Sequence, residues 1–213
     1  MKRLFALFAF LATVCYCPLA AAELHIVDMP VEWNEQREAL IREYSQTHYG
    51  MAITEIVPQA VVVHWTAADT WQSTYYHFLA PSREDGTLNV GSQFLVDRDG
   101  TVYRLMEETA FARHAIGYNW CAIGIENVGG VNNAEDLTQE QLIANVELIR
   151  YLHAKYPGIR YVFGHYQQVA ARESGLYLEL VEGYRSFKSD PGPSFMQGLR
   201  SNLSEDGLTF FPE

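Results

Sequence analysis

Short runs of apolar residues alternate along this chain with longer stretches in which apolar positions recur at helical spacing. The run at 60–63 predicts a buried strand, because it is short and side chains branched at Cβ fit a pleated surface. The runs at 122–128 and 161–163 predict two further core strands. Apolar spacing predicts helices over 33–49 and over 138–155, the second starting with a capping box. Strands alternating with helices indicate an α/β fold, a single domain with a central mixed β-sheet flanked by helices.

The connections between these elements carry turn signals of their own. Residues 91–105 predict a hairpin, because Asp-Gly favours a tight turn in which glycine takes a positive φ. Residues 67–89 predict a short helix followed by a loop. Residues 166–189 show no regular pattern, and 193–203 predict a short final helix.

The first 22 residues have the pattern of a secretory signal peptide. Lys2 and Arg3 precede an apolar stretch over 4–14, and small residues end the region at Ala22. The apolar stretch is shorter than the about 20 residues that a membrane span needs. We therefore expect cleavage after Ala22 and export to the periplasm or beyond, with no membrane span in the mature chain.

Charge and cysteine content narrow the possible partners. Removing residues 1–22 takes away Lys2 and Arg3 and no acidic residue, which changes the net charge from −11 to −13. Such acidity argues against nucleic acid as a partner, because phosphate binding needs basic patches. Cys121 is then the one remaining cysteine, so no internal disulfide is possible, and we expect it to be a small buried core residue. The roughly 190 remaining residues can support one domain, and we expect a monomer.

Two histidines and an aspartate stand where predicted elements end. His64 follows the strand at 60–63, His165 follows the strand at 161–163, and Asp190 precedes the final helix. Two imidazoles and a carboxylate match the ligands of a catalytic zinc, whose fourth position is left to water. The sequence therefore predicts one Zn²⁺ per chain. Each histidine alone is more often a satisfied core residue, and His77 is a competing ligand that we interpret as a partly exposed helix residue.

Two charged residues are candidates for the chemistry beside this site. Glu126 lies within an apolar strand, where partial burial raises the pKa of a carboxylate toward that of a general base. The alternative is a glutamate on the exposed side of an edge strand. Lys188 stands two positions before Asp190 and could stabilise a developing oxyanion; alone, it would be an ordinary surface lysine.

Three further residues are candidates for substrate contacts. Trp65 follows His64 directly, and His114 and Asn119 precede the Glu126 strand. We predict that all three line the cleft. For His114 and Asn119 the alternative is a solvated loop.

In combination and in order, these motifs resemble the zinc-dependent N-acetylmuramoyl-L-alanine amidases, which share their fold with phage T7 lysozyme and the peptidoglycan recognition proteins. The resemblance covers about residues 56–200. It is carried by Val62-Val63-His64-Trp65-Thr66-Ala67, the hairpin at 92–103, Arg113-His114-Ala115, Asn119, Ala122-Ile123-Gly124-Ile125-Glu126-Asn127, Phe163-Gly164-His165 and Lys188-Ser189-Asp190-Pro191-Gly192.

The resemblance implies a fold, a reaction and a role for each site residue. His64, His165 and Asp190 would bind zinc, Glu126 would act as the base, and Lys188 would support the oxyanion. The domain boundaries would be a signal peptide at 1–22, an extension with an amphipathic helix at 23–55, the catalytic domain at 56–203 and a tail at 204–213. The substrate would be peptidoglycan or a muropeptide, cut between the lactyl group of N-acetylmuramic acid and L-alanine. The alternative is a recognition protein that binds muropeptide without cutting it.

The chain departs from the family pattern in two places. In many members a shorter stretch separates the second histidine from the aspartate, whereas here they are 25 positions apart. We interpret the excess, roughly 167–184, as a loop beside the cleft that shapes substrate choice. Some members use a hairpin tyrosine as the base; Ser92 stands at that position, which leaves Glu126 as the candidate.

Overall fold

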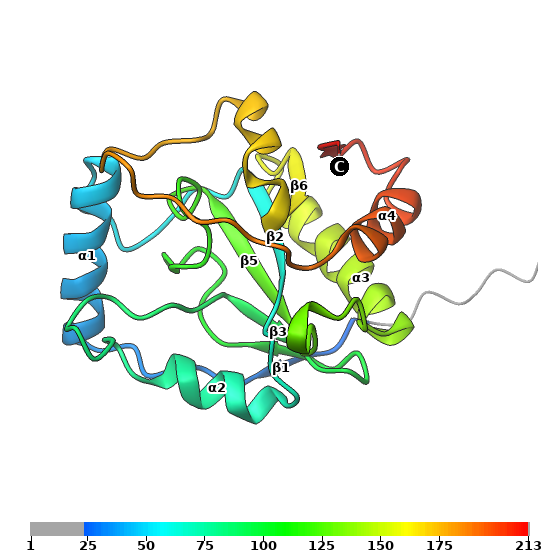
Figure 1. Ribbon diagram of the computed structural model, residues 1–213, viewed down its shortest axis with the longest axis horizontal. Helices are drawn as coiled ribbons and strands as arrows, with labels where there is room; N and C mark the ends of the chain where they lie inside the picture. Colours follow the sequence, from blue (N-terminus) through cyan, green and yellow to red (C-terminus); the bar gives the residue numbers. More distant parts are fainter. Residues whose placement is uncertain (1–23, 213) are drawn as a thin grey trace, which may run out of the picture.

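The strand that ends at His64 and Trp65 lies inside a mixed β-sheet (Figure 1). The computed structural model describes residues 24–212. Within them the strands follow the order β1-β4-β3-β5-β2-β6-β7. Their bounds are β1 Ile26–Asp28, β2 Ala60–Trp65, β3 Phe94–Val96, β4 Val102–Arg104, β5 Ala122–Asn127, β6 Tyr161–Gly164 and β7 Thr209–Phe210. The helices are α1 Glu35–Tyr49, α2 Trp71–Leu79, α3 Gln139–Lys155 and α4 Pro193–Asn202, with short 3₁₀ helices η1 Val131–Asn133, η2 His165–Gln168 and η3 Ala170–Ser174.

Parallel pairing brings the carboxyl ends of three strands to one edge of the sheet. Strand β2 pairs in parallel with β5 on one side and with β6 on the other. The hairpin β3–β4 is antiparallel, as its Asp-Gly turn predicts. The predicted α/β fold, a single domain with a mixed sheet flanked by helices, is confirmed.

Side-chain alternation along β2 decides which face carries the chemistry. Val61 and Val63 pack in the core that α3 and α4 complete. Ala60 and Val62 belong to a separate cluster on the other face. Because successive side chains of a strand point to opposite faces, His64 lies on the face of Val62, away from α3.

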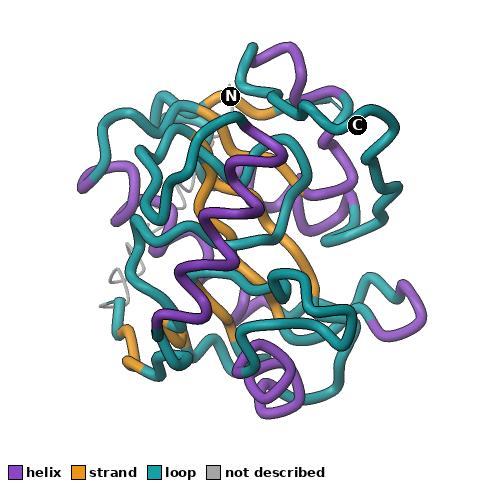
Figure 2. Tube along the Cα trace, turned by 90° about the vertical axis from the view of Figure 1, so that its left-hand side faces the viewer, coloured by secondary structure: helices purple, strands orange, loops and turns teal. Residues whose placement is uncertain are grey.

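The helix termini follow the local signals of the sequence. Helix α1 begins after Asn34, whose Oδ1 accepts the backbone N–H of Arg37 at 2.9 Å, and ends at Gly50 with φ +71°. The predicted capping box between Thr138 and Gln141 opens α3. Figure 2 views the molecule from the side of α1, and in it α1 lies in front of the strands.

Two edge strands and two short 3₁₀ helices are present that the sequence did not predict. The short edge strands β1 and β7 come from the regions predicted as extension and tail. The stretch predicted as irregular, 166–189, contains most of η2 and all of η3. Strands of two or three residues are too short to show periodicity, so only their pairing partners define them.

The predicted insertion, roughly 167–184, reaches from the end of β6 to α1. In Figure 1 this orange segment runs from the short helices after β6 to α1 and back across the sheet. At its far point, Leu180 N–H donates to the carbonyl of His48 at 2.9 Å, and Glu179 Oε1 lies 2.8 Å from His48 Nδ1. On the return path, the Tyr184 hydroxyl accepts from Arg113 at 2.9 Å.

No helix in residues 24–212 combines the length and the apolar character that crossing a membrane requires. The predicted signal peptide lies outside the described residues.

Arg37 joins α1 to α2 through buried hydrogen bonds, and its loss should destabilise the fold. Its side chain is 1% exposed and donates to the carbonyls of Phe78 and Leu79 at 3.0 and 2.8 Å, at the end of α2. Arg37→Met leaves these carbonyls without a donor. We expect the free energy of unfolding to fall by roughly 3 kcal/mol in urea titrations, since hydrogen bonds to charged groups are worth about 1.5–3 kcal/mol.

Arg42→Met on the same helix is the matched control. Arg42 is exposed and contacts Glu38 at 3.8 Å, an ion pair that contributes less than about 1 kcal/mol. Equal losses in the two variants would contradict the anchoring role of Arg37.

Candidate metal and catalytic site

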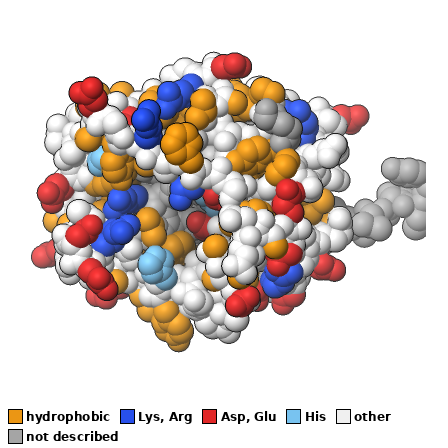
Figure 3. All heavy atoms as spheres, in the orientation of Figure 1, with side chains coloured by type: hydrophobic (Ala, Val, Ile, Leu, Met, Phe, Trp, Pro, Cys, Tyr) orange, Lys and Arg blue, Asp and Glu red, His pale blue; other side chains and the backbone are white. Residues whose placement is uncertain are grey.

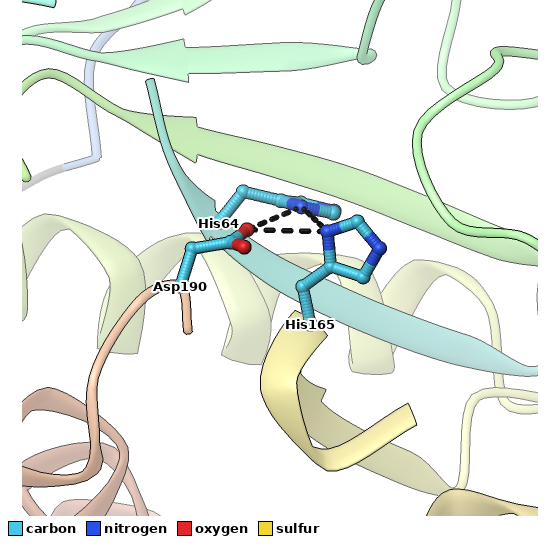
Figure 4. Close-up of side chains that lie close together, drawn as sticks. All are labelled: His64, His165 and Asp190. Carbon is cyan, nitrogen blue, oxygen red and sulfur yellow. Dashed lines mark hydrogen bonds and ion pairs between the residues drawn. The ribbon is translucent and has the colours of Figure 1, made fainter. Parts of the chain in front are cut away.

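Three side chains from distant parts of the chain converge at the carboxyl edge of the sheet (Figure 4). His64 Nδ1 lies 3.0 Å from His165 Nδ1 and 3.1 Å from Asp190 Oδ2, and His165 Nδ1 lies 3.2 Å from the same oxygen. All three residues are buried. The predicted ligand residues therefore form a small triangle of donor atoms.

Local backbone contacts hold the two later members together despite their separation in sequence. His165 opens η2 directly after β6, and the Tyr166 N–H donates to the Asp190 carbonyl at 2.9 Å. A Cβ on Gly164 would lie 2.7 Å from Pro191 Cδ, so a glycine is needed for the two segments to approach this closely.

The donor set fits a divalent metal ion. Ligands about 2.0–2.2 Å from a tetrahedral zinc lie about 3.4 Å apart, close to the sides of this triangle. Burial, with the neighbouring His64, lowers the pKa of His165 to about 4. Burial alone would raise the pKa of Asp190, but the ring nitrogens of His165 and His64 outweigh it and hold that pKa well below its usual value. At neutral pH the two groups thus have the protonation states of ligands, a neutral imidazole and a carboxylate.

Glu126 lies beside this triangle on the neighbouring strand. It is the register partner of His64 in the parallel β2–β5 pair, so both side chains project from the same face of the sheet. The carboxylate is half-buried, and its Oε2 is buried without a hydrogen-bond partner. Burial raises the pKa of Glu126 to about 7, while His64 lowers it, Asp190 raises it and Lys188 lowers it. Strand β5 lies inside the sheet, which excludes the alternative of an edge strand.

The triangle and Glu126 lie in a cleft of about 590 Å³ that opens on the face shown in Figure 3. Lys188 and Phe187, which follow the predicted insertion at 167–184, form part of its wall, and Phe187 is 87% exposed. His77 on α2 also lines the cleft but does not belong to the triangle. None of the residues 167–184 is among those that line this cleft, so a role of the insertion in substrate choice stays a prediction.

The predicted substrate-contact residues occupy different depths. Trp65 lines the cleft and is 8% exposed, and its ring packs where a Cβ on Gly130 would lie 2.2 Å away. His114 is half-buried and also lines the cleft, with its Nδ1 3.1 Å from His64 Nε2. Asn119 is fully buried behind the cleft, where its side chain bonds to the backbone of His114 and to Tyr49. The prediction that Asn119 lines the cleft is therefore wrong, because protein groups surround its side chain. For Trp65 and His114, contacts with substrate stay a prediction.

Arg113 is a cleft residue to which the sequence analysis gave no role. Its guanidinium donates to the carbonyl of Leu88 and to the Tyr184 hydroxyl, and it lies 5.0 Å from the centre of the Tyr44 ring. The sequence could have indicated Arg113 only through its place directly before His114. The groups that hold its guanidinium include Tyr44 of α1 and Tyr184 of the insertion, which are far away in the sequence. Cys121 is fully buried with its pKa raised to about 12 by burial, which confirms a small core residue.

The fold and the site together define a class of protein: an α/β domain with a candidate three-ligand metal site and an acidic side chain at the carboxyl edge of its sheet. A family model described as N-acetylmuramoyl-L-alanine amidase matches residues 54–193. The endolysin of Enterobacteria phage T3 is 34% identical over 105 residues, which cover 47% of this chain and 70% of the phage protein. The endolysin of Escherichia phage T7 is 35% identical over 104 residues, covering 46% and 69%.

Solved structures show the same fold. The N-acetylmuramoyl-L-alanine amidase LysC from Clostridium intestinale matches with a TM-score of 0.55 and 23% identity, over 84% of this chain and 97% of that one. A selenomethionine derivative of AmpD matches with a TM-score of 0.52 and 20% identity, over 86% and 95%.

The chain belongs to the N-acetylmuramoyl-L-alanine amidase family. Its activity is hydrolysis of the amide bond that joins the muramic acid of peptidoglycan to its stem peptide.

Proposed function

We propose that this amidase is zinc-dependent and uses Glu126 as its general acid–base. The observation that carries the proposal is the triangle of His64, His165 and Asp190 with the Glu126 carboxylate on the adjacent strand. When bound there, zinc supplies Lewis-acid chemistry, polarising the scissile carbonyl and lowering the pKa of water toward about 7.

Glu126 has the environment of a group that moves protons. With a pKa raised to about 7, it can take a proton from the attacking water and return it to the leaving amine of L-alanine at neutral pH. Its buried Oε2 has no partner in the described residues, so the carboxylate is not held by other protein groups.

Lys188 supports the oxygen of the scissile carbonyl. It lines the cleft two positions before Asp190, and it lowers the pKa of Glu126 by its charge. A cation there stabilises the negative charge that develops on the oxygen in the tetrahedral transition state.

The substrate is a stem peptide attached to N-acetylmuramic acid, in peptidoglycan or a soluble muropeptide. The cleft has a volume of about 590 Å³, and Phe187 and Lys188 in its wall are placed to select among stem peptides. In our proposal the enzyme is monomeric and is exported after cleavage near Ala22, which gives it access to the wall.

Mass spectrometry of the products from purified wall and from soluble muropeptides tests the proposal. The zinc-loaded chain should release intact stem peptides with a free L-alanine amine and leave the lactyl carboxylate on the sugar. Binding without release of peptide would instead support a recognition protein.

A further inference from the structure

The far side of the His64 ring is held by a second histidine. His64 Nε2 lies 3.1 Å from His114 Nδ1, and His114 Nε2 lies 3.1 Å from the carbonyl oxygen of Ala122. The two rings are perpendicular, with centroids 5.2 Å apart. This edge-on geometry places ring nitrogen against ring nitrogen rather than stacking the faces.

The carbonyl at the end of this chain fixes the protons along it. A backbone carbonyl only accepts, so His114 Nε2 carries the hydrogen that it donates to Ala122. A neutral His114 then has a lone pair on Nδ1 and accepts from His64 Nε2–H. The neutral His64 has one ring hydrogen, so its Nδ1 presents a lone pair to His165 and Asp190.

A proton on His114 Nδ1 would reverse this order. It would be donated to His64 Nε2, and the hydrogen of His64 would move to Nδ1, the atom that completes the donor triangle.

Two other residues are arranged to hold His114. Asn119 Oδ1 accepts the backbone N–H groups of His114 and Ala115 at 2.8 and 2.6 Å. The His114 ring packs on β5 at Gly124. A Cβ on Gly124 would lie 2.8 Å from His114 Cγ, so only a glycine leaves room for the ring. The buried Asn119 thus acts on the loop behind the cleft.

The other imidazole of the triangle has no such support. His165 Nε2 is buried and has no hydrogen-bond partner in the described residues. Among the described residues, His64 is therefore the histidine of the triangle whose far ring nitrogen contacts another side chain.

We infer that His114 is a positioning residue: by accepting the Nε2–H of His64, it keeps His64 Nδ1 unprotonated and aimed at the metal ion. This inference rests on the proposed metal site. Hydrogen-bond partners of metal-binding histidines typically contribute roughly 10–100-fold in metal affinity.

Two variants separate the hydrogen bond from the volume of the ring. His114→Asn keeps an acceptor oxygen near the position of Nδ1, whereas His114→Leu fills similar space without an acceptor. His153→Leu on α3 is the control, because its Nδ1 contacts the Ile159 carbonyl and no residue of the triangle. The dissociation constant for Zn²⁺ is measured for each by competition with a chelator, and metal-free unfolding curves report on structure.

We expect His114→Leu to bind Zn²⁺ roughly 10–100-fold more weakly than wild type, with His114→Asn between the two and His153→Leu unchanged. Nitrogen-15 shifts of the zinc-loaded wild type should place the ring hydrogen of His64 on Nε2. Equal affinity of wild type and His114→Leu, or a hydrogen on His64 Nδ1, overturns the inference. A wild-type chain that binds no Zn²⁺ overturns the proposed metal site and, with it, this role.

Discussion

Glu126→Gln should release the stem peptide at a small fraction of the wild-type rate while the chain retains its zinc. Glutamine has nearly the same shape and no basic carboxylate, so proton transfer from the attacking water loses its acceptor. General acid–base groups contribute roughly 10²–10⁴-fold, and we expect kcat to fall by that factor. Product release followed by mass spectrometry, together with metal content per chain, measures both quantities on the same sample.

Glu173→Gln provides the matched control, because Glu173 is exposed on η3 outside the cleft. It should retain wild-type turnover. Near-normal turnover by Glu126→Gln would show that another group takes the proton.

The raised pKa of Glu126 also predicts a pH dependence of stability in the metal-free chain. The folded-state pKa is about 7 and the ordinary value is 4.5, so the folded chain holds more protons than the unfolded chain between these values. The contribution is fully present below pH 4.5 and is lost as pH rises toward 7, by up to about 1.4 kcal/mol per pH unit. Urea unfolding of wild type and Glu126→Gln from pH 5 to 7 should show this component in the wild type alone; parallel curves would place the carboxylate in a water-like environment.

His64→Ala should lose the metal and, with it, the activity. The substitution removes one of three donor atoms that lie 3.0–3.2 Å apart and leaves two ligands. We expect the affinity for Zn²⁺ to fall by more than the roughly 10–100-fold that losing a ligand's hydrogen-bond partner costs. Metal analysis after dialysis against a weak chelator gives the content per chain.

His77→Ala tests whether any histidine of the cleft would have the same effect. His77 lines the cleft on α2 but lies outside the donor triangle, so this variant should keep its metal. Stoichiometric zinc in His64→Ala would remove His64 from the ligand set, whatever the behaviour of His77→Ala.

Local patterns in the sequence were sufficient to predict the elements that carry the site. The run before His64 predicts β2, the run around Glu126 predicts β5, and the capping box predicts α3, as observed. These signals depend on side chains within a few residues of one another, where strand alternation, caps and turn glycines act. Histidines at the ends of predicted strands could therefore be selected as candidates before their distances were known.

The tertiary structure alone decided which candidates meet and which residues hold them. Strand register set Glu126 beside His64, and a backbone hydrogen bond from Tyr166 to Asp190 closed the 25-residue separation after His165. The contact between His114 and His64 depends on the loop geometry that Asn119 fixes and on the space above Gly124. No local pattern encodes such contacts, because each depends on pairings between strands and loops far apart in sequence, which form only when the whole sheet assembles.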